Sequence, residues 1–95
     1  MLELAWRPRA NLDRESIAIY LGLECKNPQT ALAAIQRIDA AIEHARSFPD
    51  AGGRFAIDGL HHREYRTVLA SPYTVYYRCD DTALTVYRTL QSSLR

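Results

Sequence analysis

Apolar residues recur at helical spacing in one long segment of the chain. From residue 28 onward they return at steps of three and four, which places their side chains on one face of an α-helix. Asn27 is a favoured N-cap, Pro28 suits the first helical position, and Phe48-Pro49 breaks the segment. The pattern predicts a helix from Pro28 to that break, with a narrow apolar seam formed by Ala31, Ile35, Ile38, Ile42 and Ala45.

A second helix is expected upstream, after a short strand over residues 2–6 that Arg7-Pro8 ends. This helix begins at Pro8 or Asn11 and runs to about Leu23. Its apolar stripe is formed by Ile17, Tyr20 and Leu21 with Glu24 alongside, and it is widened by Leu12, Ile19 and Leu23. Because few residues separate the two helices, we expect an antiparallel helical hairpin.

The last third of the chain alternates between apolar and polar positions, which is the period of a β-strand. After an irregular stretch to about Leu60, strands are predicted over residues 63–69, 73–79 and 83–90. The turns between them are short enough to join antiparallel neighbours. The order β-α-α-β-β-β, with the hairpin on one face of an antiparallel sheet, predicts a single α+β two-layer domain over residues 1–95.

Alternation also assigns the faces of this sheet. The residues expected to face the helices are Tyr73, Val75, Tyr77, Cys79, Leu84 and Val86, and those expected to face outward are Thr74, Tyr76, Arg78, Thr85 and Tyr87. Arg88 breaks the pattern, because strict alternation puts it beside Val86 on the core side. Either a β-bulge re-aims this side chain or it is a partly buried, paired arginine. Tyr76 and Tyr87 form either a stacking platform for bases or a cross-strand aromatic pair.

Composition narrows the possible functions. The net charge of +1 gives no general electrostatic footprint for nucleic acid, so direct DNA binding by this chain is not expected. No apolar run approaches the ~20 residues of a membrane span, and the first residues lack a secretory signal, so a cytoplasmic location is expected. Nearly all basic residues are arginine, which suits bidentate contacts to carboxylate or phosphate, although a GC-rich genome produces the same bias.

Few residues are candidates for a chemical site. Cys25 and Cys79 match no metal spacing and are expected to be small core residues rather than a disulfide. His61 and His62 are adjacent on an extended segment, so they point to opposite faces and do not chelate one ion with Glu64. The sequence therefore predicts no metal, no cofactor and no catalytic residue.

Several stretches resemble, in order and spacing, the ParE-like toxins of the ParE/RelE toxin–antitoxin superfamily. The first helix is similar to the family motif Ala-x-x-Asp-Leu-x-x-Ile-x-x-Tyr, with its acidic residue at Asp13. The region after the second helix is similar to the family's Pro-x-x-Gly-Arg. The strands resemble the pattern R…Y-x-V-x-Y-R…I-x-R-V-L-H, through Arg63, residues 73–78 and residues 86–91, with Gln91 where the family often has His.

The resemblance implies the toxin of a type II toxin–antitoxin (plasmid stabilisation) pair. Such a toxin is bound by a cognate, co-expressed antitoxin through helix-in-groove and strand-addition contacts, and it inhibits DNA gyrase by binding. The residues expected to contact antitoxin or target are Arg63, Arg66, Tyr76, Arg78, Tyr87 and Arg88.

The alternative within the same superfamily is a RelE-like, ribosome-dependent mRNA endonuclease. Counting back without gaps from Tyr73, the basic positions of that branch fall at Tyr65, Thr67 and Leu69, none of which neutralises a phosphate. A nuclease would then have to be built from the arginines named above with Tyr76 or Tyr87. Arginine is always protonated and is a poor general base, so a binding toxin is the favoured interpretation.

Overall fold

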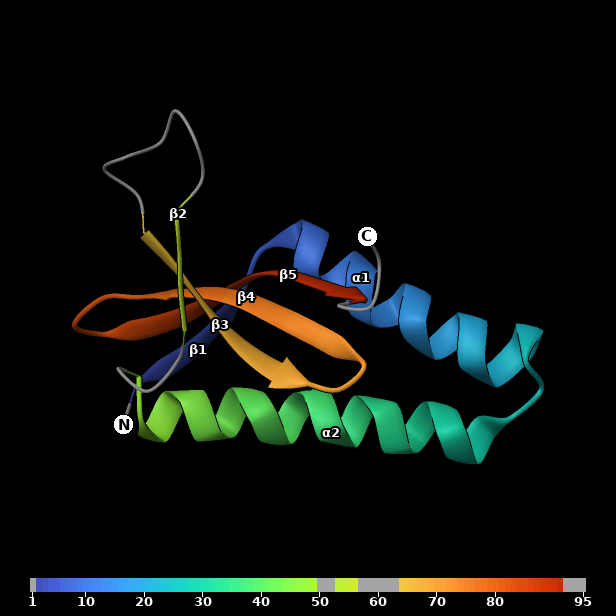
Figure 1. The fold of residues 1–95 in the computed structure, drawn as a ribbon. Coiled ribbons are helices and arrows are strands. Elements are labelled where there is room, and N and C mark those ends of the chain that lie inside the picture. The colour runs from blue at the N-terminus through green and yellow to red at the C-terminus, as the bar shows by residue number, and fades with distance from the viewer. Residues whose placement is uncertain (1, 50–52, 57–63, 92–95) are drawn as a thin grey trace.

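The structure is a computed structural model, and it describes residues 2–49, 53–56 and 64–91. Strand β1 (Glu3–Trp6) leads into helix α1 (Pro8–Ile19), which continues as a π-helical turn, η1 (Tyr20–Glu24). Helix α2 (Pro28–Ser47) follows and lies antiparallel to α1 (Figure 1). The remaining elements are the strands β2 (Gly53–Ala56), β3 (Glu64–Ala70), β4 (Tyr73–Cys79) and β5 (Ala83–Gln91).

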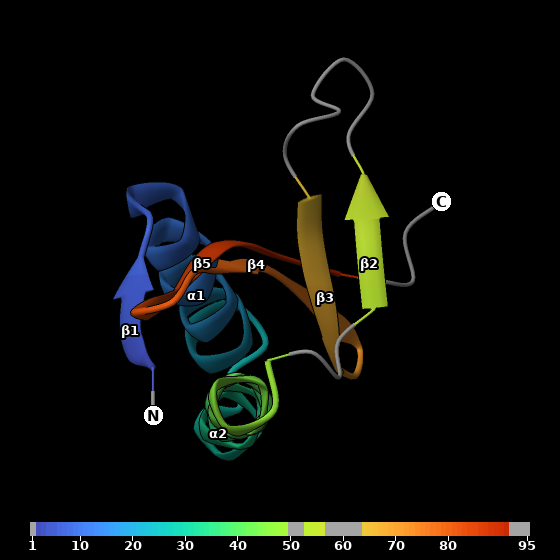
Figure 2. The ribbon, with the colours of Figure 1, turned by 90° about the vertical axis from the view of Figure 1, so that its left-hand side faces the viewer.

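The strands form a mixed, twisted sheet in the order β1-β5-β4-β3-β2 (Figure 2). The pairings among β2, β3, β4 and β5 are antiparallel, whereas β1 pairs in parallel with β5. The predicted α+β class and element order are thus confirmed, with β2 added at one edge. The parallel pairing of β1 follows from the helical hairpin, which carries the chain back across the sheet before β5 is made.

The seam of α2 forms the core, as its spacing predicts. Ile38 and Ile42 are 0% and 1% exposed, and they pack in one cluster with inward-facing residues of the sheet: Val75, Tyr77, Leu84 and Val86. The helix begins where the sequence indicates, since the Asn27 side chain accepts a hydrogen bond from the Thr30 backbone N–H. The helix seam and the alternation of β4 and β5 therefore fix which surfaces meet.

The apolar stripe predicted for the first helix is wrong in part. Leu12, Ile19 and Leu23 are 55%, 51% and 72% exposed, and Tyr20 is exposed as well. The contact of α1 with the core is instead made by Ala10, which is fully buried and lets the helix approach the sheet closely, and by the half-buried Ile17. Farther along, α1 and η1 extend beyond the end of the sheet (Figure 1), so no strand lies beneath their later apolar residues.

Strand β2 lies in a stretch that was expected to be irregular, and that expectation is wrong for residues 53–56. Gly53 pairs with Thr67 and Ala56 with Glu64 at the edge of the sheet. The four residues Gly-Arg-Phe-Ala do not alternate between apolar and polar positions, and here the pairing with β3 decides their conformation. Arg63, expected to open the next strand, lies outside the described residues, as do His61 and His62.

Both cysteines are free thiols in the structure. Cys79 is half-buried and packs against the core, as expected, but Cys25 is exposed, so its assignment as a core residue is wrong. Cys25 follows the π-helical turn at the tip of the hairpin, where the chain has left the sheet. None of the helices in the described ranges is long and apolar enough to cross a membrane.

Candidate functional site

The outer face of the sheet is shaped by a β-bulge in β5. Tyr76 of β4 pairs with Arg88, but the next residue, Tyr77, pairs with Val86, so Tyr87 is an extra residue on β5. Such a bulge interrupts strict alternation and re-aims the side chains next to it. Val86 and Thr89 therefore both face the core, at 0% and 3% exposure, while Arg88 joins Tyr76 on the outer face.

Arg88 is held from the side by α1. Its Nε donates to Asp13 Oδ2 at 2.7 Å and its Nη2 donates to Asp13 Oδ1 at 3.1 Å, a bidentate ion pair. The Asp13 side chain is 12% exposed and that of Arg88 36%. These hydrogen bonds raise the pKa of Arg88, against the opposing effect of its burial, so the charge is secure. Both alternatives considered for Arg88 are thus found together: a bulge re-aims it, and it is paired.

Aromatic rings and arginines pack on this outer face. The Tyr65 ring meets the Tyr87 ring edge-on, with centroids 5.1 Å apart and an interplanar angle of 83°. The guanidinium of Arg7 lies 5.7 Å from the Tyr87 ring centroid, and that of Arg78 lies 5.7 Å from the Tyr65 centroid. Tyr87 therefore packs on Tyr65 of β3 rather than forming the predicted pair with Tyr76. The bulge explains this, because it moves Tyr87 out of register with Tyr76.

These side chains border a groove with a cavity volume of about 410 Å³. It is lined by residues from the loop after β1, from α1 and from the three central strands: Arg7, Arg9, Tyr65, Tyr76, Tyr87, Arg88 and Leu90. We refer to it as the outer groove. Among the described residues three arginines line it and no carboxylate does, while the tyrosine rings and Leu90 supply its apolar surface. This combination suits an acidic ligand that also carries apolar side chains.

The residues predicted for the site are divided by the structure. Tyr76, Tyr87 and Arg88 line the outer groove, and Arg78 lies beside it on Tyr65. Arg66 pairs with Tyr77, whose side chain is fully buried in the core, so its register places it on the opposite face from the groove. Arg63 lies outside the described residues.

Sequence reasoning did not select four of the groove's residues: Arg7, Arg9, Tyr65 and Leu90. For Tyr65 a signal was available, because it alternates with Val68, which packs against the core. For Leu90 the signal was misleading, because strict alternation from Val86 puts it on the core side and only the bulge turns it outward. For Arg7 and Arg9 there was none, since these residues reach the groove through the turn between β1 and α1. That turn is placed by the parallel pairing of β1 with β5, and Arg7 N donates to Val86 O at 3.0 Å.

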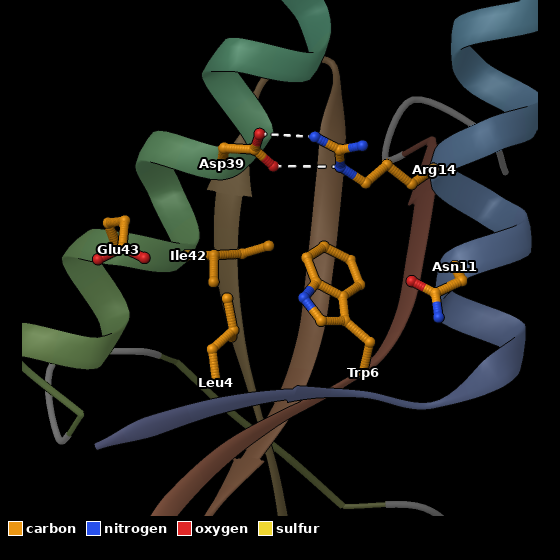
Figure 3. A pocket seen from close by; sticks show the side chains of 7 residues that line it. All are labelled: Leu4, Trp6, Asn11, Arg14, Asp39, Ile42 and Glu43. Carbon is orange, nitrogen blue, oxygen red and sulfur yellow. Dashed lines mark hydrogen bonds and ion pairs between the residues drawn. The ribbon is translucent and has the colours of Figure 1, made fainter.

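A second cavity, of about 380 Å³, lies between α1, α2 and β1 (Figure 3). Leu4, Trp6 and Ile42 form its apolar floor, and Arg14 of α1 spans it to reach Asp39 of α2. The Arg14 guanidinium donates to both carboxylate oxygens of Asp39, at 3.2 and 2.7 Å. Because Arg14 and Asp39 pair with each other and Glu43 pairs with Arg46, this cavity offers less to a charged ligand than the outer groove does. In the described part of the chain, no group of three His, Cys, Asp or Glu residues is arranged to hold a metal ion.

Comparison with known proteins bears on the fold and the family of this chain. A search of curated protein sequences gives no match. A solved structure described as the chromosomal ParDE TA system from P. aeruginosa is similar, with a TM-score of 0.71 and 23% sequence identity over 96% of each chain. At that identity the likeness concerns the fold. The family model for the ParE toxin of the type II toxin–antitoxin system parDE matches residues 4–93, so this chain belongs to the ParE toxin family.

Proposed function

We propose that this protein is the single-domain, cytoplasmic toxin of a type II toxin–antitoxin pair, which inhibits DNA gyrase by binding and is neutralised by a cognate antitoxin seated in the outer groove. The main support for the proposed binding site is the outer groove, in which Arg7, Arg9 and Arg88 lie around the rings of Tyr65 and Tyr87. Membership in the ParE toxin family supports the toxin role.

The groove has the features of a protein-binding surface. Arginine and tyrosine are enriched where interfaces gain most of their free energy, because they bury much apolar area and still make directed polar contacts. Tyr87 is braced by Tyr65 and Arg7, and Arg88 is braced by Asp13, so little side-chain freedom is lost when a partner docks. An antitoxin segment with acidic residues flanking one or two apolar side chains fits this surface.

The lining residues favour binding over RNA cleavage. Metal-free cleavage of RNA requires a group that removes a proton from the attacking hydroxyl. The groove offers arginine, which stays protonated, together with tyrosine and Leu90. Among the positions that correspond to basic residues of RelE-like toxins, Tyr65 packs on Tyr87, and Leu69 is an exposed apolar side chain.

The antitoxin site is tested at Leu90, which lines the groove and is 39% exposed. Leu90→Glu puts a carboxylate where the acidic antitoxin segment would lie, so we expect calorimetric titration to give an affinity at least tenfold weaker, or about 1.4 kcal/mol. The matched control is Leu69→Glu, because Leu69 is 64% exposed on the same sheet but does not line the groove. If both variants bind the antitoxin like the wild type, the outer groove is not its site.

The target is tested with the purified toxin. We expect it to inhibit supercoiling by purified DNA gyrase, and we expect expression without antitoxin to produce filamentous cells before protein synthesis declines. A parallel assay follows mRNA on translating ribosomes. Prompt mRNA cleavage with unaffected supercoiling would replace gyrase inhibition with the RelE-like endonuclease activity.

A further inference from the structure

We propose that Asp13 is a positioning residue of the outer groove: it holds the bulge of β5 and thereby presents Arg88 to the antitoxin. This inference rests on the proposed function, since it assigns a role within the proposed antitoxin site. Asp13 itself does not line the groove. It acts through Arg88 and Thr89, which it contacts from α1 across 75 and 76 residues of sequence.

Asp13 contacts β5 beyond the residues at which β1 pairs with that strand. Strand β1 covers β5 only as far as the pairing of Trp6 with Val86, and Arg7 N makes the last contact by donating to Val86 O. Beyond this point the chain turns into α1, and in the described part of the chain no strand pairs with β5 on that side. The Thr89 N–H donates instead to Asp13 Oδ2 at 3.0 Å. Because a buried backbone N–H without an acceptor is costly, the carboxylate completes the edge.

The same carboxylate fixes the direction of Arg88. Asp13 Oδ2 accepts from both Thr89 N and Arg88 Nε, and Oδ1 accepts from Arg88 Nη2. One side chain thus bonds the backbone just after the bulge and the guanidinium beside it. In the described part of the chain, Arg88 Nη1 makes no hydrogen bond, and the arginine lines the groove. The pair therefore presents a fixed cation whose other N–H groups can donate to an incoming carboxylate.

Holding Arg88 in place before the antitoxin binds increases the affinity, because less side-chain entropy is lost on binding. A free arginine side chain loses considerable rotamer entropy when a partner immobilises it, whereas one already held by two hydrogen bonds loses less. Asp13 is mostly buried beneath this contact, so it does not compete with the antitoxin for the exposed edge of the guanidinium. If Asp13 acts in this way, its effect on binding must depend on Arg88.

The experiment is a double-mutant cycle with Asp13→Asn and Arg88→Ala, measured as antitoxin affinity by calorimetry. The asparagine oxygen can replace Oδ2 and still accept from Thr89 N and Arg88 Nε, but the amide is uncharged and its nitrogen opposes Arg88 Nη2. We expect Asp13→Asn to weaken binding about tenfold in the Arg88 background and to have no further effect in the Arg88→Ala background. A merely structural role would give the same loss in both backgrounds, which would overturn the proposal.

Asp39→Asn is the matched control, because Asp39 also forms a bidentate pair with an arginine, Arg14, at the cavity between the helices. It removes a comparable ion pair that connects α1 to α2, so we expect wild-type antitoxin affinity. If Asp39→Asn weakens binding as much as Asp13→Asn does, loss of helix anchoring explains both results and the positioning role is rejected.

A second measurement does not depend on the antitoxin. Nuclear magnetic resonance of the free toxin is expected to show slowed hydrogen exchange of Arg88 Hε and of the Thr89 amide. Asp13→Ala should speed the exchange of both, whereas Asp13→Asn, whose oxygen can still accept from Thr89 N and Arg88 Nε, should keep both protected. Unchanged exchange of Arg88 Hε in Asp13→Ala would overturn the positioning role. Failure of the wild-type protein to bind the antitoxin would instead reject the proposed function.

Discussion

Replacing Thr89 with valine should stabilise the protein, although it removes a polar group from a strand that carries the candidate site. Thr89 is 3% exposed and faces the core opposite Val75. Its hydroxyl oxygen is buried and has no hydrogen-bond partner among the described residues. The bulge places it there, because strict alternation from Val86 through Tyr87, with no bulge, would turn Thr89 outward.

The expected gain follows from this environment. A buried polar group without a partner costs roughly 1–3 kcal/mol, and a buried methyl group contributes about 0.8 kcal/mol. Valine has nearly the same shape as threonine, and the hydrogen bond from the Thr89 backbone N–H to Asp13 is unaffected. We therefore expect Thr89→Val to raise the free energy of unfolding by about 1–2 kcal/mol, which is roughly 4–15 °C in Tm for a domain of this size.

The assay is urea denaturation of the free toxin, supported by thermal unfolding. Thr85→Val is the control, since Thr85 lies on the same strand opposite Arg78 and is only half-buried, and its change should stay within about 0.5 kcal/mol. A lower midpoint for Thr89→Val than for the wild type would refute the reasoning, because it would mean that the hydroxyl contributes to stability.

Three further predictions concern the core, a turn and the groove's margin. Ile38→Ala should lower the free energy of unfolding by roughly 2–5 kcal/mol, because Ile38 is fully buried; an unchanged urea midpoint would contradict the packing of α2 on the sheet. Hydrogen bonds from the backbone N–H groups of Thr82 and Ala83 lower the pKa of Asp80 below its ordinary 3.8. The stability that Asp80 contributes is thus present above pH 3.8 and is lost as the pH falls through the lowered pKa. Asp80→Asn should therefore remove this part of the acid dependence of Tm. A profile of Tm against pH identical to that of the wild type would contradict this prediction. Arg78→Ala should keep Tm within a few degrees but weaken antitoxin binding at least about tenfold in calorimetry, and wild-type affinity would show that Arg78 is a solvated surface residue.

Local features of the sequence were sufficient for most of the elements. The limits of β4 are those predicted, and α2 begins at Pro28 after its Asn27 cap. Each of these signals lies within a few residues, because helix caps, helical seams and strand alternation act over one or two turns or pleats. The same local rules identified Tyr76 and Tyr87 as outward-facing residues and showed that Arg88 departs from the alternation of apolar and polar positions.

Pairing between distant segments decided what the local rules left open. Arg88 had two possible explanations in the sequence, and both hold because Asp13, 75 residues earlier, lies beside the bulge. The edge strand β2 adopts its conformation through pairing with β3, and four residues carry too little alternation to show it. For η1, the exposure of Leu23 follows from how far the hairpin extends beyond the sheet, a length that amphipathicity does not specify.

The sequence alone determined the two helices, the alternating strands, the faces of β4 and the family resemblance, since each is written in neighbouring residues. Only the tertiary structure brought Arg7 and Arg9 to the rings of Tyr65 and Tyr87, and only it moved Arg66 to the opposite face. The physical reason is register: a strand's side chains alternate whatever its partner is, but the residue opposite each one is set by the pairing and by the single extra residue of the bulge.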